Sequence, residues 1–169
     1  MSLNLIPDFM FDDIYSVTPD FLTSLGVSGV ILDIDNTLVP YENDRPTECV
    51  LSWLSSLREA GIRCAIVSNN NKKRVDLFNF EISLPAYYHS AKPFADSVKR
   101  AMKDIERDKS ECIFIGDQIL TDVWAAHNAG IRAVLVNPIK DKTDPFTRLK
   151  RKIEKHFIKK YKERKNNVG

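Results

Sequence analysis

The chain has 169 residues, of which 43% are hydrophobic and 28% are charged, and its formal net charge is +2. This length fits one domain with a sizeable core, and the composition is that of an ordinary globular protein. No apolar run is long enough to span a bilayer, and the first residues lack the pattern of a secretory signal, so we expect a cytoplasmic protein.

Five continuous apolar runs predict β-strands that are covered on both faces, at residues 29–34, 63–67, 86–88, 111–115 and 132–136. Helical patterns lie between them, at residues 47–59, 72–79, 94–105 and 122–128. This alternation predicts a single doubly wound, Rossmann-like α/β domain with a central parallel five-stranded sheet. Ligands of such sheets bind beyond the carboxyl ends of the strands.

The last part of the chain differs from the rest in charge. Residues 144–165 contain ten Lys or Arg and three Asp or Glu, so this segment carries +7 and the remainder about −5. One apolar helical stripe is expected from residues spaced three or four apart, namely Phe146, Leu149, Ile153, Phe157 and Tyr161. We therefore divide the chain into a core, residues 1–143, and a basic amphipathic helix and tail, residues 144–169, packed on or extending from that core.

Three roles are open for this basic helix. Its stripe would dock on the core, or the helix would lie on an anionic membrane surface at the inner face of the membrane. Alternatively, its cations would contact RNA phosphates.

Polar side chains follow the predicted strands at the point where each strand ends. In chain order they are Asp33, Asp35, Ser68, Asn69, Lys92, Asp117 and Asp122. Carboxylates that leave a buried strand are costly unless a cation or a reaction requires them. Four acids near one lysine repel each other, and a divalent cation would balance them. Because no His accompanies these oxygen ligands, the residues favour Mg²⁺ over Zn²⁺ and predict a site that accepts a phosphate.

Four motifs in order resemble the haloacid dehalogenase (HAD) superfamily of phosphotransferases. They are the DxDxT segment of residues 33–37, the strand-terminal Ser68, Lys92 before a helix, and the GDxxxxD segment of residues 116–122. The chain looks most like the small YqeG-like branch of subfamily IIIA, which is similar to phosphatases of phosphatidylglycerophosphate. We expect no cap domain, because neither the interval 38–46 nor the interval 71–90 accommodates a folded lid.

The resemblance implies a phosphatase that works through an aspartyl-phosphate. Asp33 would be the nucleophile, and Asp35 would act as general acid and then as general base. Lys92 would offset the negative charge of the nucleophile and the phosphoryl group. These three are the implied catalytic residues.

The same resemblance implies the residues that hold the metal and the phosphate. Mg²⁺ would be held by Asp33, Asp35 (through its backbone carbonyl), Asp117 and Asp122, with Asp122 in the outer shell or orienting Lys92. The phosphate would be bound or braced by Ser68, Asn69, Lys92 and Thr37. His127 lies in a small-residue helical turn and is interpreted as structural, whereas the role of His89 stays open.

An uncapped site suits a large or exposed phosphorylated substrate. The candidates are a lipid head group such as phosphatidylglycerophosphate, a phosphoprotein, a nucleic-acid end and a large metabolite. Two alternatives remain: a HAD-like module that binds RNA, the ribosome or a protein and has secondary phosphatase activity, and a phospho-accepting signalling domain. The position of both Asp33 and Asp35 after one strand disfavours the signalling domain. The oligomeric state is left open.

Overall fold

The computed structural model describes residues 4–140 and 145–168. One parallel sheet has the strand order β1-β6-β5-β2-β3-β4. The strands are β1 (Phe9–Phe11), β2 (Gly29–Leu32), β3 (Arg63–Val67), β4 (Ala86–Tyr87), β5 (Cys112–Gly116) and β6 (Arg132–Val136). The α/β class and the five expected strands are confirmed. The strand count of five is wrong, because the short and half-buried β1 pairs with the edge of β6 and carries no alternation long enough to detect.

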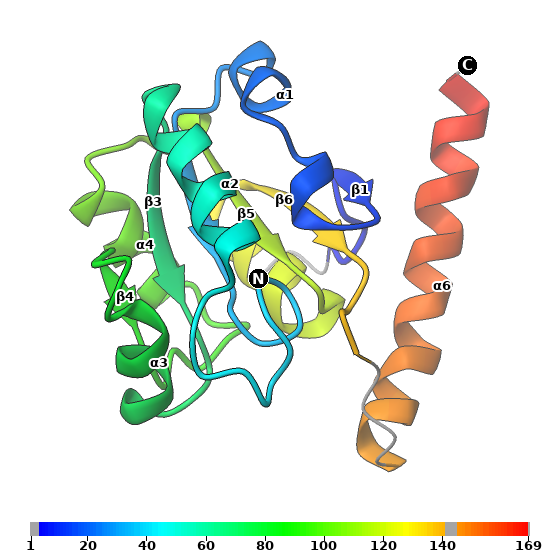
Figure 1. Ribbon diagram of the computed structural model, residues 1–169. Coiled ribbons are helices and arrows are strands. Elements are labelled where there is room, and N and C mark those ends of the chain that lie inside the picture. The colour runs from blue at the N-terminus through cyan, green and yellow to red at the C-terminus, as the bar shows by residue number, and fades with distance from the viewer. Residues whose placement is uncertain (1–3, 141–144, 169) are drawn as a thin grey trace.

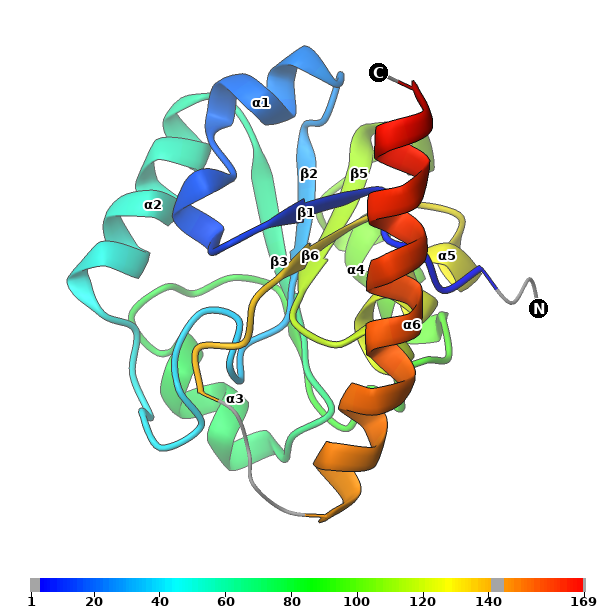
Figure 2. The same cartoon turned by 90° about the vertical axis from the view of Figure 1, so that its right-hand side faces the viewer.

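Helices cover both faces of the sheet. Their bounds are α1 (Pro19–Ser24), α2 (Glu48–Glu59), α3 (Lys72–Asn79), α4 (Asp96–Asp104), α5 (Trp124–Ala129) and α6 (Pro145–Val168). Helices α1 to α3 lie on one face and α4 to α6 on the other, as Figures 1 and 2 show. After β2 the chain builds β3 and β4 on one side and then returns to β5 on the other. The strand order therefore reverses at β2, which is where doubly wound sheets bind ligands.

The central strands divide the core into two layers. All four residues of β2 are buried. Leu32 packs in the cluster that includes Leu57 of α2, whereas Ile31 packs in the cluster that includes Val98 of α4. This alternation follows from the two-residue period of a strand. Packing on both faces holds β2 in the middle of the sheet, and this positions the loop that follows β2.

The segment after β5 begins with a wider helical turn than the sequence suggests. A helix was expected at residues 122–128, but a π-helical turn, η3 (Ile119–Val123), comes first and α5 follows it. Helix α5 ends at Gly130, whose positive φ of 81° suits a residue without a side chain. The π-turn carries Asp122, and such turns are frequent at functional sites.

Helix α6 exists as expected, but the expected stripe is wrong in part. The side chains of Leu149 and Ile153 are exposed, at 58% and 44%, whereas Glu154 is buried and Phe157 and Ile158 pack against the core. The face of the helix that meets the core therefore differs from the expected stripe, because Glu154 accepts a hydrogen bond from the Ile119 amide in the loop after β5. The boundary expected at residues 143 and 144 and the side chain of Phe146 lie outside the described residues.

Candidate active site

The polar side chains expected at the carboxyl edge of the sheet surround one pocket. Its volume is about 290 Å³. The lining residues are Asp33, Asp35, Tyr41, Ser68, Asn69, Asn70, Lys92, Gln118, Thr121, Asp122 and Lys150. They come from the loops after β2, β3, β4 and β5 and from the first turns of α6. The geometry therefore brings together all the expected catalytic side chains, with Asp117 directly beneath the pocket.

Lys92 is the central cation of the pocket. Its Nζ donates to Asp33 Oδ1 at 2.6 Å and to Asp122 Oδ1 at 2.7 Å, and all three side chains are buried. Burial alone would lower the pKa of Lys92, but the charges of Asp122 and Asp33 outweigh it and raise the pKa above its ordinary value. The ammonium thus stays charged and links Asp33 of the DxDxT motif to Asp122 of the GDxxxxD motif.

Three carboxylates form a compact cluster at the same place. Asp33, Asp117 and Asp122 each offer an oxygen that lies within 4.8 Å of the other two. Burial raises the pKa of Asp33 to about 7, although the charge of Lys92 opposes it. Burial and the charges of Asp122 and Asp33 raise the pKa of Asp117 to about 8. The nearby positive charge is therefore too small to keep all three acids ionised at their usual pKa values.

Gly116, the last residue of β5, makes room for this cluster. A Cβ atom at this position would lie 2.4 Å from Asp122 Oδ2 and 2.5 Å from Asp122 Cβ. Asp122 Oδ2 also accepts a hydrogen bond from the Gln118 amide at 3.0 Å. The glycine of the GDxxxxD motif is therefore required so that Asp122 can fold back over the strand end.

Asp35 points to a different set of partners. Its Oδ1 accepts from Arg74 Nε and Nη2 at 3.1 and 2.9 Å, and its Oδ2 accepts from Asn70 Nδ2 at 3.0 Å. Its carboxylate is not part of the three-acid cluster. Sequence reasoning missed both partners, because it assigned no role to Arg74 and placed Ser68 and Asn69, but not Asn70, in the site. The spacing could have indicated Arg74, because Asn71 caps the start of α3 and Arg74 lies in the first turn of that helix, close to the strand end.

The remaining expected residues act on their neighbours. Ser68 is buried, and its Oγ accepts the Asn70 amide at 3.0 Å. Asn69 makes two hydrogen bonds to the backbone of Lys92, at 2.8 and 3.2 Å. Thr37 Oγ1 donates to Asp117 Oδ1 at 3.3 Å and does not line the pocket. Asn69 and Thr37 thus hold Lys92 and Asp117 in place.

Helix α6 supplies two residues that sequence reasoning missed. Arg151 donates to the backbone oxygen of Asp117 at 3.1 Å and to Asp117 Oδ2 at 3.2 Å. Glu154 accepts from Arg151 at 2.9 Å and from the Ile119 amide at 2.8 Å. The role of the basic run was left open, because periodicity alone does not distinguish a cation that faces the core. The carboxyl-terminal helix therefore forms part of the site.

Comparison with known proteins places this geometry in a family. The model of the haloacid dehalogenase-like hydrolases matches residues 41–136, which is more than half of the chain and begins after Asp33 and Asp35. The chain is also 36% identical over 153 residues to the probable phosphatase YqeG of Bacillus subtilis, covering 90% of this chain and 89% of that protein. The chain belongs to the haloacid dehalogenase-like hydrolase family.

Two further HAD relatives extend the comparison. Phosphatidylglycerophosphate phosphatase 1 of Arabidopsis thaliana is 25% identical over 93% of this chain, which spans only 48% of that protein. A HAD-superfamily hydrolase from Ehrlichia chaffeensis has the same fold, with a TM-score of 0.55 and 17% identity over 79% of this chain and 97% of that one. The family and its curated relative place this protein among the HAD-type phosphatases.

The ion pairs of the HAD site favour a divalent cation. Pairs of 3.2 Å or shorter join the carboxylates of Asp33, Asp35, Asp117, Asp122 and Glu154 to the cations of Arg74, Lys92 and Arg151. These pairs contain five acids and three bases, and Lys150 also lines the pocket, so the acids outnumber the bases. Hard oxygen ligands with no His among them suit Mg²⁺, so the residues present fit the metal that the family implies.

Other parts of this hydrolase lie outside the chemistry. His127 donates through Nδ1 to Asn4 O (2.6 Å) and through Nε2 to Asp8 Oδ2 (2.9 Å), and it does not line the pocket, in agreement with the structural interpretation. His89 contacts the ring of Tyr88. Within residues 4–140 and 145–168 there is no inserted cap domain, and no helix there is both long and apolar enough to cross a bilayer.

Proposed function

We propose that this protein is a Mg²⁺-dependent phosphomonoesterase that works through an aspartyl-phosphate on Asp33. The observation that carries the proposal is the three-acid cluster beside Lys92 at the switch point of the sheet. Mg²⁺ bound by Asp33, Asp117, the Asp35 backbone oxygen and, directly or through its outer shell, Asp122 would neutralise charge on the phosphoryl group. The cationic side chains then need only orient that group.

The hydrogen bonds of Asp33 select its attacking atom. Lys92 occupies Oδ1, and no described residue donates to Oδ2. Oδ2 would attack phosphorus, the bond to the ester oxygen would break, and an acyl phosphate would form. Ser68 and Lys92, which both line the pocket, would bind the phosphoryl oxygens. Water would then attack the acyl phosphate and release inorganic phosphate and free Asp33.

Asp35 would protonate the leaving oxygen and later deprotonate the water. In the structure its carboxylate accepts three hydrogen bonds from Arg74 and Asn70. These contacts hold Asp35 at the pocket that it lines.

The mechanism is tested by trapping the intermediate. The purified protein is expected to hydrolyse a generic aryl phosphate with Mg²⁺ and to stop when EDTA is added. Acid quenching during turnover with a ³²P-labelled ester should leave label on one peptide, the one that contains Asp33. Continuous release of inorganic phosphate distinguishes this enzyme from a phospho-accepting signalling domain, which would retain its phosphate. Label on another residue would overturn the nucleophile assignment.

For the substrate, we propose phosphatidylglycerophosphate in an anionic membrane. The proposal is supported by the similarity to the Arabidopsis phosphatidylglycerophosphate phosphatase and by an uncapped pocket. It is also supported by α6, which begins beside the pocket with Lys150 in its lining and exposes Leu149 and Ile153 among basic side chains. Exposed apolar side chains with surrounding cations fit a lipid surface better than they fit RNA phosphates.

Vesicle binding tests the membrane part of this proposal. The protein should co-sediment with phosphatidylglycerol vesicles, and the double variant Leu149→Ser, Ile153→Ser should bind at least fivefold more weakly. The matched control is Tyr15→Ser, which changes an exposed apolar residue far from α6 in the chain. Binding to RNA but not to anionic vesicles would favour the RNA-binding alternative instead.

A further inference from the structure

Arg74 is a buried cation on a helix whose other charged residues face water. Lys72, Lys73 and Asp76 of α3 are exposed, whereas Arg74 is buried. Asn71 caps the start of α3, and its Oδ1 accepts the Arg74 amide at 2.9 Å, which places Arg74 in the first turn after β3. Taking a guanidinium out of water is costly, and apolar side chains of similar volume often stabilise such positions as well or better. The burial of Arg74 therefore indicates a role other than stability.

The contacts of Arg74 are directed at one carboxylate oxygen. Its Nε and Nη2 both donate to Asp35 Oδ1, at 3.1 and 2.9 Å. Its Nη1 is buried and donates to no described residue, although Asp44 Oδ1 lies 3.7 Å away. Buried polar atoms that serve packing alone are nearly always hydrogen-bonded. The guanidinium is thus placed for Asp35 rather than for its own satisfaction.

Asn70 holds the other oxygen of Asp35. Its Nδ2 donates to Asp35 Oδ2 at 3.0 Å, and its Oδ1 accepts the Asn71 amide at 2.8 Å. Because the Asn71 amide can only donate, this second bond fixes which end of the Asn70 side chain faces Asp35. The Ser68 hydroxyl accepts the backbone amide of Asn70 at 3.0 Å and holds the turn. Both oxygens of Asp35 are therefore held by the segment that follows β3.

These bonds leave one acceptor position of Asp35 available. A carboxylate has about four such positions, about two on each oxygen. Arg74 fills those of Oδ1, and among the residues that the structure describes Asn70 alone donates to Oδ2. Asn70 lines the catalytic pocket and Arg74 does not, so Oδ2 is the oxygen on the side of the pocket. The free position on Oδ2 is the place from which a proton can reach a leaving oxygen.

We propose that Arg74 is a positioning residue for the general acid and base of the reaction, and that Asp35 Oδ2 is the atom that carries the proton. Arg74 occupies Oδ1, so the proton is held on Oδ2, and Asn70 sets the direction of the remaining position. Arg74 acts through Asp35 and does not touch the substrate. The inference rests on the proposed function, because it takes Asp35 as the acid that protonates the leaving oxygen.

The test uses two esters that differ in their need for an acid. Para-nitrophenyl phosphate releases a stable phenolate that departs without a proton, whereas benzyl phosphate releases a basic alkoxide that requires one. Arg74→Lys keeps the charge but replaces the planar guanidinium by a single ammonium. The ratio of kcat/KM for benzyl phosphate to kcat/KM for para-nitrophenyl phosphate should fall at least about tenfold, because a positioned general acid contributes about a hundredfold to ten-thousandfold. An unchanged ratio would overturn the proposal, since a merely structural role lowers both values together.

Two further variants keep the result independent of how well Arg74→Lys folds. Asn70→Ala removes the bond to Asp35 Oδ2 from a half-buried side chain, and it should lower the same ratio about threefold, the scale of one lost hydrogen bond. Arg58→Lys changes an exposed arginine of α2 that donates to Ser55, and this matched control should leave the ratio unchanged. A ratio that Asn70→Ala leaves at the wild-type value would contradict the assignment of Oδ2.

Asp35→Asn separates this proposal from the proposed mechanism. It removes the acid itself, so it should lower the ratio by more than Arg74→Lys does. If Asp35→Asn lowers the ratio and Arg74→Lys does not, the mechanism stands and the positioning role fails. If Asp35→Asn leaves the ratio unchanged, Asp35 is not the acid, and the proposed mechanism fails together with the inference that rests on it.

Discussion

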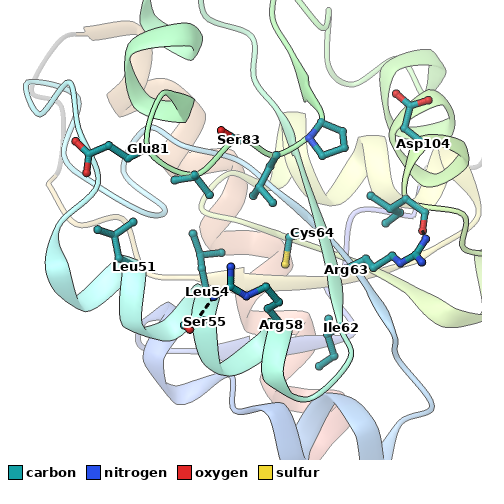
Figure 3. Close-up of a pocket in the computed structure, with 14 residues that line it drawn as sticks. Leu51, Leu54, Ser55, Arg58, Ile62, Arg63, Cys64, Glu81, Ser83 and Asp104 are labelled. Carbon is teal, nitrogen blue, oxygen red and sulfur yellow. Dashed lines mark hydrogen bonds between the residues drawn. The ribbon is translucent and has the colours of Figure 1, made fainter.

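The two ends of the sheet are built for different purposes. At the carboxyl edge, a pocket of about 290 Å³ gathers buried acids and Lys92. Near the amino end of β3, a groove of about 570 Å³ is lined by mainly apolar side chains from α2, β3, the loop 81–85 and α4. In Figure 3 Leu51 and Leu54 lie on one side of this groove, and Arg58 lies between Leu54 and Ile62. The larger hollow has no cluster of acids, so chemistry, rather than size, identifies the site.

The difference predicts that variants at the two ends fail in different ways. Groups that repel each other at the carboxyl edge contribute to catalysis and lower the stability of the metal-free protein. Groups that pack near the amino end contribute to stability and leave the reaction unaffected.

The largest effect is expected for Asp33→Asn. An amide cannot form the acyl phosphate, so turnover of an aryl phosphate should fall at least about a thousandfold, the scale for losing a covalent nucleophile. The melting temperature should stay the same or rise, because Lys92 keeps its bond to Asp122. Steady-state kinetics and thermal unfolding on one preparation measure both. Turnover within tenfold of the wild-type value would remove Asp33 from the mechanism.

The opposite behaviour is expected for Leu54→Ala in the groove near the amino end. Leu54 is buried against the core, and its truncation should lower the free energy of unfolding by about 2 kcal/mol, the low end for such changes because it adjoins an existing hollow. Urea unfolding measures the loss. Turnover per folded molecule should not change. A large drop in turnover with intact folding would show that the two ends are coupled.

A third effect concerns pH and arises from Asp117. Burial and neighbouring acids raise its pKa to about 8, so the folded metal-free protein holds this proton more tightly than the unfolded chain does. The stabilisation is full below the unfolded pKa and is lost as pH rises through about 8. Thermal unfolding in EDTA should show a melting temperature that falls by about 3–6 °C between pH 5 and pH 8. Mg²⁺ should restore more of it at pH 8 than at pH 5.

The control for this pH effect is Asp117→Asn, which cannot titrate. Its melting temperature in EDTA should vary less with pH than that of the wild-type protein. Equal slopes for the two proteins would assign the effect to other groups, of which Asp33 is the first candidate because burial also raises its pKa.

The sequence predicted every strand of the sheet except β1, and it predicted the acids, but not the groups that hold them. The strands after which Asp33, Ser68 and Asp117 occur are continuous apolar runs, and parallel strands bring their carboxyl ends to one edge. The partners of those groups depend on how helices rotate when they dock. The roles of Arg74 and Arg151 were not predicted, since a charged residue shows no periodicity that marks it as buried.

The docking of α6 shows why such contacts escape a sequence pattern. The apolar spacing placed Leu149 and Ile153 on one stripe with Phe157, but Leu149 and Ile153 are exposed whereas Phe157 packs against the core. Two polar contacts to the loop after β5, from Glu154 and Arg151, fix the helix in another rotation. Buried hydrogen bonds to charged groups contribute about 1.5–3 kcal/mol each, comparable to the burial of one leucine. A helix with few large apolar residues is therefore oriented by its polar contacts.

The smallest effect is expected for Glu154→Gln, which shows whether α6 supports the metal ligands at the carboxyl edge. Glu154→Gln keeps the size of the side chain but leaves only one oxygen to accept from both Ile119 and Arg151. The loop with Asp117 should loosen, and Mn²⁺, used as a spectroscopic substitute for Mg²⁺, should bind about tenfold more weakly, a change of about 1.4 kcal/mol. Electron paramagnetic resonance titration measures this affinity without turnover.

The matched control for this variant lies on the same helix. Glu163→Gln changes an exposed acid that pairs with Lys159 at 3.8 Å, and it should leave Mn²⁺ affinity unchanged. If Glu154→Gln lowers the melting temperature but not the affinity for Mn²⁺, α6 is a stabilising cover that belongs with the apolar packing. If the affinity falls and the melting temperature changes little, the helix acts as a distant support of a metal ligand, because Arg151 holds Asp117 only while Glu154 holds Arg151.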